Sequence, residues 1–121
     1  MKRRAPQREF YSIGEVCELL ALKPHVLRYW ETQFDAFSPA KNRQGNRVYR
    51  ARDLELIALI RRLVHEEGYT IEGARRKIDE LRSSGDVGAS SGRALEESFV
   101  RSLRTELEEI LELLGPAAIR E

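Results

Sequence analysis

Apolar residues recur three or four positions apart in four stretches of the chain, and this spacing predicts four helices. We expect these helices over residues 13–20, 24–34, 54–68 and 70–82. The turn at residues 21–23 separates the first two helices. Two helices joined by so short a turn are typical of the helix-turn-helix motif, in which the second helix enters the major groove of DNA.

The second helix has the most informative pattern. Pro24 suits its first position, because the fixed φ angle and the missing N–H cost nothing there. Its faces hold Leu27, Trp30 and Phe34 on the apolar side, and His25, Arg28, Tyr29 and Thr32 on the polar side. All four polar groups can bond phosphate oxygens or base edges. An ordinary amphipathic helix with a solvated polar face is the alternative interpretation.

The first helix begins at a predicted capping box. Ser12 and Glu15 have the required spacing, so the hydroxyl group accepts from an early backbone N–H and the carboxylate accepts from the N–H of Ser12. Cys17 lies on the apolar face of this helix, and we expect a small buried hydrophobe rather than a redox group. One cysteine makes neither a disulfide framework nor a Cys-x-x-Cys metal pair, so we expect no metal and no cofactor.

A basic β-hairpin is expected directly after the second helix. Residues 37–52 contain five cations and no acidic residue: Lys41, Arg43, Arg47, Arg50 and Arg52. Gly45, between Gln44 and Asn46, favours a chain reversal between two short strands, which would form a wing over about residues 38–50. Exposed hairpins also collect basic residues for solubility, but five uncompensated positive charges repel one another and need a counterion.

The chain changes composition after the fourth helix. Residues 83–93 hold four serines and three glycines, which predicts a flexible linker. Residues 94–114 then carry an apolar stripe with heptad spacing, formed by Val100, Leu103, Leu107, Ile110 and Leu114. A single helix of this length is marginal in water. The stripe therefore either docks on its own domain or pairs with a second copy of the chain, and the linker favours pairing.

Charge is distributed unevenly along the chain. Residues 1–82 contain 17 basic and 12 acidic side chains, whereas residues 83–121 contain 4 and 8. This asymmetry indicates that the first part meets a polyanion. We expect residues 1–9 to be a flexible basic arm, which can touch phosphates, and residues 115–121 to be a tail.

The sequence also argues against several classes of protein. No stretch approaches the ~20 apolar residues of a membrane span, and no apolar stretch follows the basic start as in a signal peptide. We therefore expect a cytoplasmic, nucleoid-associated protein without a membrane partner. The usual signs of an enzyme are not evident, because we find no nucleophile–base pair, glycine-rich phosphate loop or carboxylate constellation.

Four ordered motifs resemble the MerR family of bacterial transcription regulators: YSIGEV (11–16), LRYWE (27–31), GNRVY (45–49) and EEGYTIEGARRKI (66–78). The resemblance covers about residues 10–82. It implies a mainly α-helical protein with a winged helix-turn-helix core of four helices and a small β-hairpin. A linker and a C-terminal dimerisation helix, which pairs antiparallel with a second copy, would follow the core. The sequence shows neither the ligand domain nor the cysteine loop of drug- and metal-sensing relatives, so we infer no effector.

The resemblance also implies roles for single residues. Arg28 and Tyr29 match positions that hold DNA from the second helix, and Arg47 matches a wing arginine that contacts phosphate. His25 and Val26 lie where helix residues approach base edges. The predicted DNA-binding residues are Lys23, His25, Val26, Arg28, Tyr29, Lys41, Arg43 and Arg47. Lys23 departs from the Ser or Thr that usually caps the second helix, and Arg50 departs from the Ser that usually caps the third.

The expected function is that of a dimeric, sequence-specific regulator of transcription. It would bind an inverted-repeat promoter operator in double-stranded DNA, with the second helix in the major groove and the wing on the phosphate backbone. RNA polymerase is a further candidate partner. The alternative is a non-regulatory, architectural or excisionase-like DNA-binding protein of the same fold, which would bind DNA without changing promoter output.

Overall fold

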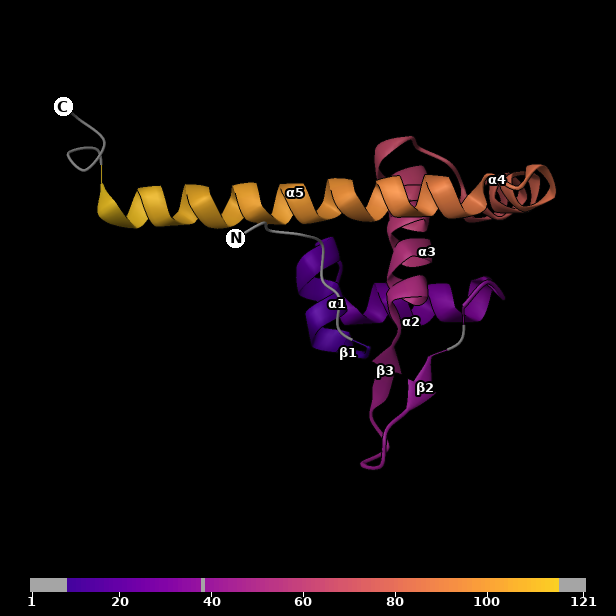
Figure 1. Cartoon of the computed structure of the whole chain (residues 1–121), viewed down its shortest axis with the longest axis horizontal. Helices are drawn as coiled ribbons and strands as arrows, with labels where there is room; N and C mark the ends of the chain where they lie inside the picture. Colours follow the sequence, from indigo (N-terminus) through magenta and orange to yellow (C-terminus); the bar gives the residue numbers. More distant parts are fainter. Residues whose placement is uncertain (1–8, 38, 116–121) are drawn as a thin grey trace.

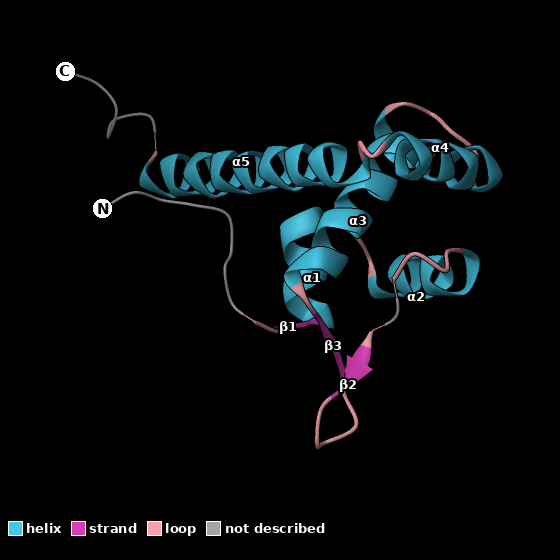
Figure 2. Ribbon diagram, turned by 45° about the vertical axis from the view of Figure 1, so that its right-hand side comes forward, coloured by secondary structure: helices cyan, strands magenta, loops and turns pink. Residues whose placement is uncertain are grey.

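The computed structural model describes residues 9–37 and 39–115 of the chain (Figure 1). The described chain is mainly helical, with a small three-stranded sheet, and this confirms the predicted class of fold (Figure 2). The predictions of a basic arm and a C-terminal tail concern residues outside the described ranges, apart from Glu9 and Gly115.

The predicted capping box starts the first helix, α1 (Ile13–Leu20). The Ser12 hydroxyl accepts from the N–H of Glu15 at 3.1 Å, and the Glu15 carboxylate accepts from the N–H of Ser12 at 2.9 Å. The helix ends at Ala21 in the left-handed conformation (φ +54°), so the chain turns sharply. Helix α2 (Pro24–Gln33) then begins with proline at its first position, as predicted.

The predicted hairpin is formed by β2 (Ala40–Lys41) and β3 (Arg47–Tyr49), and β3 also pairs antiparallel with β1 (Tyr11–Ser12). Its turn is fixed by the Asn42 side chain, whose oxygen accepts from the N–H groups of Gln44 and Asn46 at 3.0 Å each. Gly45 occupies the left-handed region (φ +83°) that this turn requires. The hairpin projects from the side of the molecule opposite α5 (Figure 1).

The third helix, α3 (Ala51–Arg61), is the centre of the core. The sequence predicted one inward stripe, but this helix is buried on most of its circumference, because α1 and α5 both pack against it. It continues into a π-helical turn (Arg62–Glu66) before Gly68 (φ +77°) ends the segment near the predicted position. Helix α4 (Ile71–Ser84) follows, capped by the Thr70 hydroxyl, which accepts from the N–H of Gly73.

The predicted flexible linker at residues 83–93 is wrong. Helix α4 runs to Ser84, Gly85 makes the turn in the left-handed conformation, and helix α5 (Val87–Leu114) contains the remainder of that segment. Burial explains the difference, because the small side chains of Ser90 and Ser91 pack inside the protein. Tertiary packing of this kind stabilises a helix that its glycine and serine content disfavours.

The apolar face predicted for α2 lies in the core, where Leu27, Trp30 and Phe34 are each at most 2 % exposed. Cys17 is buried as predicted, and this burial raises the pKa of its thiol. In the described part of the chain, no helix combines the length and the hydropathy needed to cross a membrane.

Candidate nucleic-acid interface

The polar face of α2 is open to solvent. His25, Arg28 and Tyr29 are all exposed, and Tyr29 exposes 53 % of its surface. The Thr32 hydroxyl donates to the carbonyl oxygen of Tyr29 at 2.6 Å, so its proton is already engaged with the helix backbone. Val26, by contrast, is half-buried and packs against the core. The helix therefore offers an imidazole, a guanidinium and a phenol to a ligand.

The wing and α2 share one groove. A hollow of about 420 Å³ is lined from α2 by Arg28 and from the hairpin by Lys41 and Arg47, and Ser12 and Gly45 also line it. Lys41 and Arg43 are exposed, as is Lys23 at the start of α2, whose side chain makes no capping bond. Helix α2 and the wing thus place positive charge around a single concave surface, where phosphate groups would be attracted.

A carboxylate that the sequence interpretation missed connects these two elements. Glu31, on α2, accepts from Nε of Arg47 at 3.0 Å and from the hydroxyl group of Tyr49. The Glu31 side chain is only 9 % exposed. Burial and this hydrogen bond raise the pKa of Tyr49 well above its usual range. Glu31 is the single acidic residue between Glu18 and Asp35, which is a weak sequence signal for a structural ion pair.

A second connection joins α4 to the end of α2. The Arg75 guanidinium makes two hydrogen bonds to Gln33. Its Nε donates to the backbone carbonyl oxygen of Gln33 at 3.0 Å, and its Nη2 donates to the side-chain oxygen of Gln33 at 3.4 Å. The His65 ring, in the π-helical turn, lies 5.4 Å from the Trp30 ring between centroids. The segment from the π-helical turn to α4 is thereby positioned against α2.

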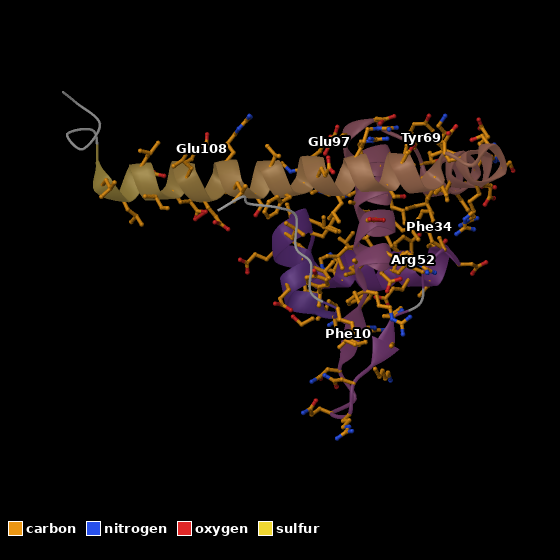
Figure 3. The ribbon with its side chains drawn as sticks, in the orientation of Figure 1. Phe10, Phe34, Arg52, Tyr69, Glu97 and Glu108 are labelled. Carbon is orange, nitrogen blue, oxygen red and sulfur yellow. The ribbon has the colours of Figure 1, made fainter. Side chains whose placement is uncertain are left out.

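Helix α5 has two different halves. Its first half packs on the core through Ala94, Leu95 and Ser98. Its second half projects past the core, and Glu108 lies on this projecting part (Figure 3). There the predicted dimerisation residues are largely in solvent: Val100, Leu107, Ile110 and Leu114 are 53 to 61 % exposed, and Leu103 is half-buried.

A helix-turn-helix with an exposed polar second helix, flanked by a basic wing, defines a winged helix-turn-helix protein of the DNA-binding kind. The chain belongs to the MerR family of transcription regulators, because the model of the "MerR HTH family regulatory protein" matches residues 11–81. This confirms the family predicted from the four motifs.

Individual relatives agree with the family. An uncharacterized HTH-type transcriptional regulator of Pseudomonas aeruginosa is 31 % identical over 104 residues, which span 82 % of this chain and 74 % of the relative. The HTH-type transcriptional repressor CarH of Myxococcus xanthus is 28 % identical over 71 residues, spanning 59 % of this chain but only 23 % of CarH. No solved structure matches the chain.

Proposed function

We propose that this chain is a dimeric, sequence-specific regulator of transcription, with α2 in the major groove of DNA and the β2–β3 wing on the phosphate backbone. The observation that carries the proposal is the shared groove, in which Arg28 of α2 and Lys41 of the wing face one concave surface. An α-helix fits the major groove, and arginine and imidazole side chains can read base edges there.

The cations of this surface fall into two groups. Within the described ranges, Arg28, Lys41 and Arg43 have no carboxylate partner, whereas Arg47 is held by Glu31. An unpaired cation gains the full attraction of a phosphate, while a paired cation must share its charge. We therefore assign the main phosphate contacts to Arg28, Lys41 and Arg43, and a positioning contact to Arg47. His25 is the candidate for reading a base.

Dimerisation through α5 follows from the exposed stripe. An isolated projecting helix that exposes several large apolar side chains is costly in water, and pairing with a second copy would bury them. The stripe does not pack on its own domain, which was the alternative expectation. Dimerisation would place two α2 helices against two half-sites related by a two-fold axis.

Charge favours an antiparallel arrangement of the pair. Residues 106–114 contain four glutamates and no basic residue, whereas residues 87–105 contain three arginines and two glutamates. Parallel pairing would gather eight carboxylates along one short stretch of the dimer, and like charges at such distances repel. Antiparallel pairing separates the two acidic ends.

Two measurements test this proposal. Sedimentation should show a dimer for the full chain and a monomer for Leu107→Asp, because that variant puts an unpaired charge in the seam. Mapping of bound sites in cells should then place them between the −35 and −10 elements of promoters, where a regulator can act with RNA polymerase. Sites scattered without regard to promoters would favour an architectural protein of the same fold instead.

A further inference from the structure

The π-helical turn between α3 and α4 carries an unusual pair of ion pairs. Arg61 forms an ion pair with Glu66, and Nε of Arg62 lies 3.2 Å from a carboxylate oxygen of Glu67, so each pair joins residues five positions apart. In an α-helix, residues at this spacing lie roughly 140° apart around the axis and do not meet. The wider π-helical turn, with its i→i+5 bonding, brings them to one side. These two pairs therefore favour the π-helical turn over a regular α-helical one.

Helix α5 adds one charge to each of these ion pairs. Arg101 donates to the Glu66 carboxylate at 3.0 Å, and Glu97 approaches the Arg62 guanidinium at 3.7 Å. Glu97 lies on the half of α5 that covers α3 (Figure 3). A second hydrogen bond holds the Arg101 side chain in place, because its guanidinium donates to the buried Ser98 hydroxyl at 2.9 Å. The result is two clusters on the same turn: Arg61, Glu66 and Arg101 form one, and Arg62, Glu67 and Glu97 form the other.

The other side of the same turn reaches the candidate DNA-binding helix. His65, next to Glu66, packs its ring against Trp30 of α2, and Trp30 is 2 % exposed. The chain then leaves the turn and enters α4, whose Arg75 bonds to the last residue of α2. A change in the rotation of the π-helical turn would therefore move both contacts with α2.

We propose that Arg101 is a positioning residue for DNA binding, acting on α2 through Glu66 and the π-helical turn although it lies on α5, away from the wing and from the polar face of α2. This inference rests on the proposed function, since its readout is affinity for DNA. Removing the Arg101 guanidinium leaves Glu66 with Arg61 only. The π-helical turn then loses the shorter of its two ion-pair contacts with α5, and the contacts of His65 and Arg75 with α2 become less well fixed.

Arg104 provides a matched control. It lies three residues further along α5, carries the same charge, and has no ion-pair partner in the described chain. Arg101→Ala and Arg104→Ala therefore change net charge equally, so any general electrostatic effect on DNA affinity is shared. Sedimentation of both variants verifies that the oligomeric state is that of the parent chain.

The experiment is a double-mutant cycle read by DNA affinity and by the fluorescence of Trp30, the single tryptophan of the chain. Arg101→Ala should weaken binding to the preferred site roughly fivefold more than Arg104→Ala does, and only Arg101→Ala should change the Trp30 emission. Arg101→Lys should restore most of the affinity, and Glu66→Gln with Arg101→Ala should cost no more than the larger single effect, because the two residues act as a unit.

Three outcomes decide the matter. A parent chain that binds no DNA would refute the proposed function itself. If the parent chain binds DNA and both Arg101→Ala and Arg104→Ala keep nearly the same affinity as the parent, the role of Arg101 is overturned. Additive effects of Glu66→Gln and Arg101→Ala would also overturn it, because they would mean that the two side chains act separately.

Discussion

Glu31 of α2 and Arg47 of the wing form an ion pair, with 3.0 Å between the carboxylate oxygen and Nε. The Tyr49 hydroxyl donates to the other oxygen of the same carboxylate. The wing is therefore attached to α2 by a charged group placed among the cations expected to meet phosphates. This carboxylate both fixes the position of the wing and reduces the positive charge of the surface.

Because of these two effects, Glu31→Gln should change affinity for unrelated DNA and preference for the specific site in opposite directions. Loss of the negative charge should raise affinity for unrelated DNA, and the dependence of affinity on salt should become steeper. Preference for the specific site should fall, because the wing is no longer held in register with α2. Titrations of the parent and the variant with both kinds of DNA measure this. Equal specificity ratios for the two proteins would show that the pair does not position the wing.

The unpaired cations of the wing should dominate the salt dependence. For the proposed dimer we expect affinity for DNA to fall about 10³- to 10⁵-fold between 50 and 200 mM salt, as for a protein with roughly 6–10 phosphate contacts. Arg43→Ala should lower the slope of log affinity against log salt by about 0.9 for each phosphate that Arg43 neutralises. Arg47→Ala should lower this slope less, because Glu31 already shares that charge. It should also reduce the preference for the specific site, because it breaks the same Glu31–Arg47 pair.

Arg47→Ala should also differ from Arg43→Ala in stability. Removal of Arg47 leaves a nearly buried carboxylate without its cation, so the free energy of unfolding should decrease, whereas Arg43 is exposed and makes no such pair. Urea unfolding of both variants provides the comparison. In the salt titrations described above, Arg43 would be excluded from the phosphate contacts if Arg43→Ala left the slope of log affinity against log salt unchanged.

The glycines of the wrongly predicted linker give a test of its helical structure. Gly92 lies inside α5, and a Cβ atom added there meets nothing within 4 Å. Gly92→Ala should therefore stabilise the protein by about 0.5–1 kcal/mol, since alanine favours a helix. Gly85→Ala should instead destabilise it, because the left-handed turn there (φ +82°) favours glycine and strains a residue with a Cβ atom. Thermal unfolding distinguishes the two variants, and a Gly92→Ala variant of unchanged stability would argue for a flexible linker at this position.

His65 should make stability depend on pH. Burial, and after it the charge of Arg61, lowers the pKa of His65 below its ordinary value of 6.5. The unfolded chain therefore binds a proton more readily than the folded chain, so this contribution to stability is present above pH 6.5 and is lost as the pH falls through the lowered pKa. His65→Asn should reduce this dependence. Urea unfolding followed by Trp30 emission, between about pH 5 and 8, would measure the pH dependence of stability in both proteins. Identical pH profiles for the parent and His65→Asn would exclude His65 as the source of this dependence.

The sequence identified much of this structure because its strongest signals are local. The capping box at Ser12, the proline at the start of α2 and the turn around Gly45 each fix the backbone through neighbouring residues. The apolar face of α2 was found in the same way, from helical spacing alone.

The features that the sequence did not reveal depend on contacts between distant parts of the chain. Glu31 meets Arg47 across 16 positions, and Arg101 meets Glu66 across 35. Residues 87–93 were misjudged because composition reports the preference of an isolated segment. The burial of Ser90 and Ser91 against the core outweighs that preference, and only the folded arrangement shows it.

Selection of binding sites from random DNA tests the central claim most directly. The parent chain should enrich two inverted half-sites about one helical turn apart, near 34–36 Å, as two α2 helices related by a two-fold axis require. His25→Ala should keep the spacing but relax the preference at one or two base pairs of each half-site, by about 1–3 kcal/mol. No enriched motif in the parent chain would contradict sequence-specific binding, and an unchanged motif in His25→Ala would contradict the assigned reading role of that residue.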